Sequence, residues 1–239
     1  MKSIRYIILL LIVASPTLVG WGSYSPFQDS ALNVTNTAVG SSGWLQEKVS
    51  SIHYQADNLD VNVLKLSLNA YAKARSKGLD NKRLLTIIDY SKPSNERRLW
   101  VVDVLHSKVL YNTWVTHGKN SGAVNATSFS NQVGSLKSSL GVFLTDSAPY
   151  MGGNGYSLRM IGLEPGINDN AYRRSTVFHG AAYASPEVAK RYGGLGRSWG
   201  CPAVDKAIAK PFIDTIKNRT VVVAYYPDHK WLSQSRWVG

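Results

Sequence analysis

Hydrophobic residues in the first third of the chain recur at the spacing of an α-helix. Leu45, Val49 and Ile52 lie three or four positions apart, which places their side chains on one face of a helix. A second stripe of this period ends before Gly78, a typical helix stop. Its members are Val61, Leu64, Leu68, Tyr71 and Ala72. The pattern predicts two helices packed on the main domain, and a separate wall-binding or partner-binding element is the alternative.

From Leu84 onward the pattern changes to short runs rich in β-branched and aromatic residues, which are typical of strands. A break at His106-Ser107 predicts a hairpin between two of these runs. The runs cover residues 84–89, 99–105, 109–116, 142–146, 156–163, 176–179 and 220–225. Because strands outnumber helices here, we expect a mostly β core with peripheral helices, an α+β fold.

The segments between these runs have their own signals. Residues 120–139 are polar and predict a long loop, and residues 151–155 predict a flexible connector. Ser185-Pro186 opens a short helix, since Ser caps a helix and Pro suits its first turn. Residues 203–217 have a helical period that Pro211 is expected to break or kink.

The N-terminus has the composition of a secretory signal peptide. Lys2 and Arg5 precede a short apolar run from Ile7 to Val13, and small residues follow. The run is short for a membrane span, and an uncleaved anchor is the alternative. We therefore expect a signal peptide over residues 1–20, a linker and helical segment over 21–83, and the main domain over 84–239. The predicted location is outside the cytoplasm, in the periplasm or cell wall.

The charge is strongly positive. The chain has 27 Lys and Arg against 15 Asp and Glu, a net charge of +12. Without Lys2 and Arg5 the basic count falls by two, which leaves about +10. Such a charge favours contact with an anionic wall or membrane surface, and a solvated basic surface without a partner is the alternative. The sequence has no recognisable nucleic-acid-binding module, so we expect no nucleic acid partner. We also expect a monomer.

Cys201 is the only cysteine and lies in the stretch Ser198-Trp199-Gly200-Cys201-Pro202. Gly200 permits backbone conformations closed to other residues, and Pro202 restricts the cysteine before it. A single cysteine cannot form an internal disulfide, so the thiol is either buried and inert or kept for chemistry. No Cys-x-x-Cys pair and no zinc-ligand spacing is present, and we expect no metal and no cofactor.

A thiol attacks as the thiolate, which needs a neighbouring base or cation. Of the five histidines, His179 has the best context, because it ends an apolar strand-like run and precedes Gly180. The N–H groups of Cys201 and of Gly200 or Trp199 are natural donors to an oxyanion at such a turn. The sequence places no carboxylate at a spacing that would orient the imidazole.

These residues resemble the L,D-transpeptidase (YkuD-like) family, and most closely its murein L,D-transpeptidase catalytic domain branch. His179-Gly180 followed by Ser198-x-Gly200-Cys201 reproduces the family's order of His before Cys. The resemblance covers residues 84–225. Two positions depart from the family pattern: Trp199 stands where many members have a second His, and Ala203 where many have Arg. Further matching segments are residues 115–119, 139–143 and 156–163.

The resemblance implies a β-sandwich-like catalytic domain with Cys201 as nucleophile and His179 as general base. It further implies that a backbone carbonyl, of Gly180 or Ser198, orients the imidazole and that the Ser198 hydroxyl supports the loop. Residues near the pair are candidates for substrate contact, and the alternative is ordinary packing or solvated surface. They are Tyr183, Arg191, Arg197, Trp199 and His117.

The implied activity is that of an exported cysteine L,D-transpeptidase acting on peptidoglycan stem peptides. The acyl group would pass through a Cys201 thioester with loss of the terminal D-alanine. Three alternatives stay open: an L,D-carboxypeptidase of the same fold, a sortase-type transpeptidase that uses Arg219, and a non-catalytic cell-wall-binding module.

Overall fold

A computed structural model describes residues 38–238, so the predicted signal peptide and most of the predicted linker lie outside the described residues. Two helices come first, seven strands follow, and shorter helices then alternate with the last two strands. The helices are α1 (Ser42–His53), α2 (Val61–Ser76), α3 (Pro186–Tyr192), α4 (Lys206–Ile216) and α5 (His229–Gln234), with a 3₁₀ turn η1 (Ala182–Ala184). The strands are β1 (Leu84–Asp89), β2 (Leu99–Asp103), β3 (Lys108–Thr113), β4 (Gly141–Thr145), β5 (Tyr150–Gly152), β6 (Gly155–Gly162), β7 (Val177–Ala181), β8 (Ala203–Asp205) and β9 (Val221–Tyr225).

The nine strands form one mixed sheet in the order β3-β2-β1-β9-β4-β6-β7-β8, with β5 paired to β6. Two neighbouring pairs, β1 with β9 and β7 with β8, are parallel, and the other pairs are antiparallel. The hairpin predicted at His106-Ser107 joins β2 to β3, and Ser107 takes a left-handed φ of 52° in its turn. The predicted mostly β core with peripheral helices is confirmed.

The sheet curls so that its two end strands approach each other. The segment after β3 runs beside the segment that leads into β8. Thr116 N–H donates to Ala203 O at 2.9 Å, and Ser198 N–H donates to His117 O at 3.0 Å. These backbone bonds close the sheet toward a barrel, and they bring residues 116–119 next to the stretch that contains Cys201.

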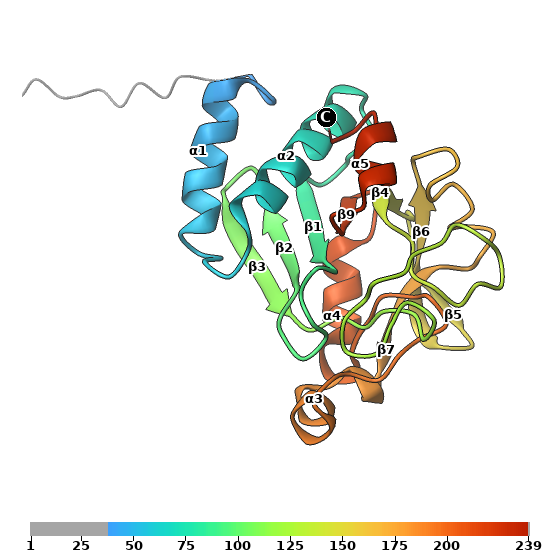
Figure 1. Ribbon diagram of the computed structural model, residues 1–239. Coiled ribbons are helices and arrows are strands. Elements are labelled where there is room, and N and C mark those ends of the chain that lie inside the picture. Colours follow the sequence, from blue (N-terminus) through green and yellow to red (C-terminus); the bar gives the residue numbers. More distant parts are fainter. Residues whose placement is uncertain (1–37, 239) are drawn as a thin grey trace, which may run out of the picture. The chain divides into compact units, whose positions relative to one another are not determined.

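Helix α4 fills the space between the two halves of the curled sheet (Figure 1). Phe212 on α4 is fully buried and packs edge-on against Tyr111 of β3 and Phe178 of β7, with ring centroids 5.5 Å away in each case. Gly180 of β7 leaves no room on this side, because a Cβ there would lie 2.7 Å from Cβ of Ala209. The close approach of α4 to β7 therefore depends on a glycine directly after His179.

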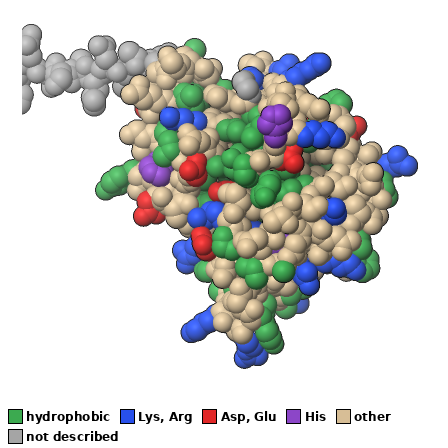
Figure 2. Space-filling view, in the orientation of Figure 1, with side chains coloured by type: hydrophobic (Ala, Val, Ile, Leu, Met, Phe, Trp, Pro, Cys, Tyr) green, Lys and Arg blue, Asp and Glu red, His purple; other side chains and the backbone are tan. Residues whose placement is uncertain are grey.

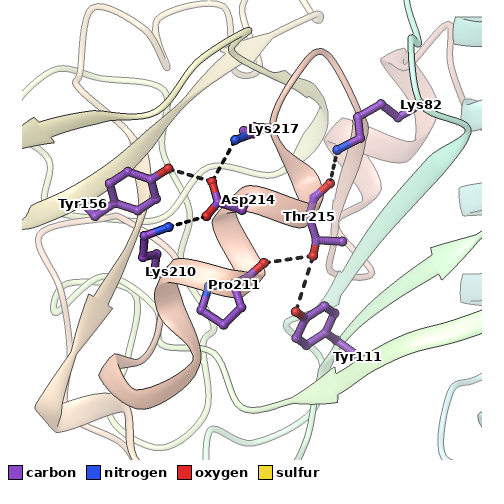
Figure 3. A network of polar contacts seen from close by, with 8 residues as sticks. All are labelled: Lys82, Tyr111, Tyr156, Lys210, Pro211, Asp214, Thr215 and Lys217. Atoms are coloured by element: carbon purple, nitrogen blue, oxygen red, sulfur yellow. Dashed lines mark hydrogen bonds and ion pairs between the residues drawn. The ribbon is translucent and has the colours of Figure 1, made fainter.

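Polar contacts anchor α4 on its β6 side. Asp214 accepts hydrogen bonds from the Tyr156 hydroxyl (2.7 Å), Lys210 (2.7 Å) and Lys217 (2.9 Å). These donors hold the pKa of the Asp214 carboxyl well below its usual range, with the two lysines and Tyr156 as the largest causes. The arrangement ties the helix to β6, as the side chains in Figure 3 show.

Thr215 anchors the opposite side of the same helix. Its carbonyl accepts from Lys82 Nζ at 2.6 Å, and its hydroxyl lies 3.4 Å from the Tyr111 hydroxyl (Figure 3). The hydroxyl also donates to Pro211 O at 2.9 Å. The helix is continuous through Pro211, so the predicted break was wrong. Burial of residues on both sides of the proline outweighs the one hydrogen bond that proline cannot make.

Helices α1 and α2 pack on the main sheet and share its core. Trp44 of α1 stacks on Tyr71 of α2 at 6.3 Å, and Leu64 and Leu68 of α2 are fully buried. Helix α2 lies against β1 and β9. The predicted packing of both helices on the main domain is confirmed, and residues 38–238 belong to one compact unit. The predicted boundary at residue 84 marks a change from helix to strand within that unit.

Two short strands differ from the sequence-based expectation. Residues 150–152 form β5 in a tight hairpin with β6, in the segment predicted to be a flexible connector. Residues 203–205 form β8 in the segment predicted to be helical. Both strands are only three residues long, and such strands are fixed by their partner and not by their own pattern.

The surface is mixed in character. Lys and Arg side chains are spread around the outline of the face in Figure 2, and hydrophobic side chains gather near its centre. No helix among residues 38–238 is long and apolar enough to cross a membrane.

Candidate active site

The loop that carries Cys201 is shaped by the Ser198 hydroxyl. Ser198 Oγ accepts from Gly200 N–H at 3.1 Å and donates to Cys201 O at 2.6 Å. One buried hydroxyl thus links both sides of the turn, which is a typical use of serine in turns. The predicted supporting position of Ser198 matches this geometry.

Thr116 fixes the loop from the neighbouring segment. Its hydroxyl accepts from Ala203 N–H at 3.1 Å and lies 3.4 Å from Cys201 O. With the backbone bond from Thr116 N–H to Ala203 O, the residue contacts both sides of Pro202. The backbone around Cys201 is therefore held from outside the loop as well as from within it.

Gly200 meets two requirements that only glycine satisfies. Its φ is +124°, a region that L side chains rarely adopt, and a Cβ there would lie 2.8 Å from Lys137 O. Its N–H is already bonded to Ser198 Oγ. This corrects the expectation that Gly200 N–H serves an oxyanion, because the loop itself uses that donor. The N–H groups of Trp199 and Cys201 have no acceptor among the described residues.

The Cys201 thiol lies against the start of β7 and is half-buried. Its Sγ donates to Ser175 O at 3.7 Å. Burial raises the pKa of the Cys201 thiol, while the Val177 N–H and the positive charge of Arg174 act in the opposite direction. Because burial is the largest cause, the thiol is neutral at pH 7 in this arrangement.

His179 lies on the strand beside this loop. In the parallel pairing of β7 with β8 its partner is Ala203, two residues after Cys201. Its Nδ1 lies 3.2 Å from Gly180 O, so the neutral ring carries its proton on Nδ1 and leaves a lone pair on Nε2. Burial lowers the pKa of His179, and the bond to Gly180 opposes that shift. The imidazole is therefore an unprotonated base at neutral pH.

The sequence was compared with known proteins. Residues 55–225 match the family model described as the L,D-transpeptidase catalytic domain, and this match covers more than half of the 239 residues. The chain belongs to this family. The search of curated proteins found no match.

Several solved L,D-transpeptidase structures are similar. That of Mycobacterium smegmatis is 14% identical with a TM-score of 0.38, over 60% of this chain and 59% of that one. L,D-transpeptidase 1 of Mycobacterium tuberculosis is 12% identical with a TM-score of 0.35, over 60% and 62%. That of Stackebrandtia nassauensis is 11% identical with a TM-score of 0.37, over 77% and 91%. This L,D-transpeptidase domain thus spans about three-fifths of the length of the two mycobacterial chains.

Three of the predicted substrate contacts lie close to the cysteine loop of the L,D-transpeptidase domain. Tyr183 is near enough to Cys201 that the thiolate charge contributes to raising the tyrosine pKa, after burial as the main cause. Arg197 is exposed, and Trp199 is 76% exposed at the tip of the loop. Arg191 is exposed in the last turn of α3.

His117 lies in the interior instead. Its side chain is buried, with Nδ1 2.8 Å from Arg98 Nη2 and Nε2 3.3 Å from Gly122 O. Arginine only donates, so Nδ1 accepts and Nε2 carries the proton. Burial, with Arg98 as the next cause, lowers the pKa of His117 to about 4. This placement favours a structural role over the substrate contact expected from the sequence.

Arg98 is the centre of a buried polar cluster that the sequence analysis missed. The residue is 0% exposed, and its guanidinium donates to Val115 O and Lys92 O and lies over the Tyr90 ring. Burial lowers the pKa of Arg98 to about 10. The cluster contacts the segment 115–119 through Val115 and His117. The same segment forms backbone hydrogen bonds with the cysteine loop.

The sequence analysis also missed Arg174, whose charge acts on the Cys201 thiol. Its guanidinium bonds to Ser130 O, Ser139 Oγ and Lys137 O in the long loop before β4. The next residue, Ser175, supplies the carbonyl that contacts the thiol. Arg174 therefore connects the loop 130–139 to the backbone around Cys201 and places a cation near the sulfur.

No cluster of three or more His, Cys, Asp or Glu side chains suited to a metal occurs among the described residues. The Cys201 thiol is accompanied by the Arg174 guanidinium and backbone amides, and His179 lies on the strand whose partner follows the cysteine. This set is suited to acyl transfer through a thioester.

Proposed function

We propose that the protein is a cysteine L,D-transpeptidase that acts on peptidoglycan stem peptides, with Cys201 as nucleophile and His179 as base. The observation that carries this proposal is the pairing of β7, which contains His179, with β8, which follows Cys201. Strand β7 brings His179, oriented by Gly180 O, alongside the built turn that presents Cys201. Membership of the L,D-transpeptidase family supports the same assignment.

The first step forms the acyl-enzyme. His179 Nε2 takes the thiol proton as Cys201 Sγ attacks the carbonyl carbon that precedes the terminal D-alanine. The C–N bond then breaks, and the imidazolium gives its proton to the leaving amine. Thioester and free D-alanine are the products. Burial favours the neutral imidazole and the neutral thiol, which suits His179 to act as a general base toward Cys201.

The second step resolves the thioester. An acceptor amine loses its proton to His179 Nε2 and attacks the thioester carbonyl. The C–S bond then breaks, and the imidazolium returns its proton to the sulfur, which restores the thiol. Transfer to an amine gives a crosslinked peptide, whereas transfer to water gives a tripeptide acid. The L,D-carboxypeptidase reaction is therefore the alternative on the same residues.

The negative charge on the attacked carbonyl oxygen needs donors. We assign this role to the N–H groups of Cys201 and Trp199, because Gly200 N–H is bonded to Ser198. The immobilised turn holds these amides in place before the reaction, which is what makes such donors effective.

We further propose that the protein is exported and works at the cell wall. The basis is the sequence of its first 20 residues and the net charge of about +10 that remains without Lys2 and Arg5, which favours an anionic surface. An anionic wall or membrane surface is the proposed contact beyond the stem peptides.

Mass spectrometry of the protein incubated with disaccharide tetrapeptides tests the proposal. We expect a product dimer joined through third-position residues, a transient acyl adduct on Cys201, and neither with Cys201→Ala. Tripeptide alone, again lost in that variant, would identify a carboxypeptidase. No turnover, no adduct and an unreactive thiol would contradict both activities and leave the wall-binding alternative.

A further inference from the structure

A pocket lies beside the cysteine loop, on the side of α3. Its volume is about 540 Å³, and its walls include Lys119, Tyr183, Tyr192, Leu195 and Arg197. One side is the segment after β3, and the other is the turn from η1 through α3 to the cysteine loop. The pocket is thus built from the same two segments that hold Cys201, and it is open to solvent at its cationic rim.

The cations of this pocket have no carboxylate partner within the described residues. Arg197 is exposed, and its guanidinium donates to the backbone carbonyls of Lys119 and Gly122, at 3.4 and 3.2 Å. Lys119 is exposed and lies 5.9 Å from the centre of the Trp199 ring. Both positive charges are therefore available to an anion in the pocket.

Short backbone bonds connect the pocket to the candidate nucleophile. Lys119 N–H donates to Ser198 O at 2.8 Å, and Gly196 N–H donates to Tyr183 O at 2.8 Å. A Cβ on Gly196 would lie 2.5 Å from Cβ of Tyr183, so these backbones are in close contact. Tyr183 also lies within electrostatic reach of the Cys201 sulfur. The backbone that carries the pocket's cations is therefore tied to the loop that carries Cys201.

We propose that this pocket is a carboxylate subsite, in which Lys119 and Arg197 bind one free carboxylate of the peptide substrate. The bound carboxylate is one that takes no part in the acyl transfer, and its role is to position the peptide against Cys201. Tyr183 and Tyr192 supply the apolar walls against which the peptide backbone packs. This inference rests on the proposed function, because it assumes a peptide substrate at Cys201.

The chemistry of the pocket separates a carboxylate from its amide. An arginine guanidinium and a lysine ammonium bind a carboxylate by charge-assisted hydrogen bonds. A carboxamide offers only one neutral acceptor oxygen, and its NH2 group is a donor that would face the donors of Lys119 and Arg197. The structure therefore predicts that the enzyme distinguishes peptides whose carboxylates are free from those in which one is amidated.

Binding to the Cys201→Ala protein, measured by calorimetry, tests the subsite without turnover. The probes are a synthetic stem tetrapeptide ending in D-alanine, with all carboxylates free, and each of its single carboxamides. We expect one amidation to weaken binding roughly tenfold, and the double variant Lys119→Met/Arg197→Met to weaken the free peptide by a similar factor. The double variant should bind that one carboxamide and the free peptide equally.

A matched control separates the pocket from the net charge. Lys65→Met/Lys190→Met removes two exposed lysines, on α2 and α3, that lie outside the pocket, and it should bind the free peptide like the parent protein. Equal loss in the control, or binding that no amidation changes, would overturn the subsite while leaving the proposed function intact. No binding by any peptide, together with no acyl adduct on Cys201 in the unsubstituted protein, would overturn both.

Discussion

Arg174 is the cation whose charge acts on the Cys201 thiol. Its charge lowers the thiol pKa, whereas burial raises it by a larger amount. The residue also joins the loop 130–139 to the backbone at Ser175. A charge effect and a positioning effect are thus combined in one side chain, and a substitution series can separate them.

We expect Arg174→Gln to raise the thiol pKa and to slow alkylation of Cys201 by iodoacetamide several-fold at pH 7, because the thiolate loses a nearby cation. The measurement is the alkylation rate from pH 6 to 10, which should rise with pH and shift to higher pH in the variant. Arg174→Lys keeps the positive charge, so its profile should lie close to that of the parent protein. If Arg174→Gln lowers the rate equally at every pH, without moving the profile, the charge effect is refuted and only positioning remains.

The two reactive residues could be predicted because their signals are local. Cys201 sits in a short run of turn residues, and His179 ends a strand-like run before Gly180. Arg174 and Arg98 have no such signal, because each bonds to backbone carbonyls and hydroxyls far from it in the sequence. Nothing in the local pattern separates a buried arginine from a solvated one. The same reason explains why the burial of His117 was not predicted, because its ring bonds to Arg98, 19 positions away in the sequence.

At the scale of elements, the packing of α4 on β7 determines where His179 lies. Gly180 lies directly under Ala209 of the helix, with no room for a methyl group. Because Gly180 O also contacts the His179 ring, a shift of the helix is expected to move the base. Stability and activity should therefore change together at this contact.

We expect Gly180→Ala to destabilise the protein by about 1–3 kcal/mol, since the added Cβ overpacks the interface between β7 and α4. Ala209→Gly opens space opposite it and costs about 1 kcal/mol on its own as a glycine within a helix. In the double variant the two costs should be less than additive, by urea denaturation, and turnover should recover in parallel. Additive costs would show that the two positions do not compete for the same space.

Asp214 makes the attachment of α4 to β6 sensitive to pH. Its pKa is held below the usual range by Lys210, Lys217 and Tyr156, so the folded protein binds this proton less readily than the unfolded chain. The contribution to stability is therefore present above about pH 4, the ordinary carboxylate pKa, and is lost as the pH falls toward the folded value.

We expect Asp214→Asn to lower the urea midpoint slightly at pH 7, because asparagine keeps an acceptor for Tyr156 but loses the charge. The difference from the parent protein should shrink at pH 3, because the unfolded parent chain there takes up a proton that the folded protein still excludes. Asp57→Asn, an exposed position outside this network, serves as the control. A difference that stays constant between the two pH values would exclude the charge as its origin.

Periodicity predicted the long elements and not the short ones. The stripe on α2 and the buried runs of β1 and β9 are strong patterns, since their own residues decide which side is buried. Strands β5 and β8 depend on pairing with β6 and β7. Helix α4 continues through Pro211 because Phe212, Ile213 and Ile216 are buried around it, and a local rule cannot weigh that burial.

At the scale of the whole molecule, the two N-terminal helices and the sheet form one core. Helix α2 covers β1 and β9, the third and fourth strands in the sheet order, and its residues Leu64 and Leu68 are fully buried. Each such side chain contributes about 1.5–3 kcal/mol by burial. A handful of them equals the whole net stability of a domain, roughly 5–15 kcal/mol.

A chain that begins at residue 84 should therefore not fold, although it retains every strand and both Cys201 and His179. We expect residues 38–239 to unfold in one cooperative thermal transition, and residues 84–239 to show none and to aggregate through the apolar faces of β1 and β9. Calorimetry and near-ultraviolet circular dichroism of the two chains provide the test. A single sharp transition in the shorter chain would establish residue 84 as a true domain boundary, and helices α1 and α2 would then be an accessory attached to a self-sufficient sheet.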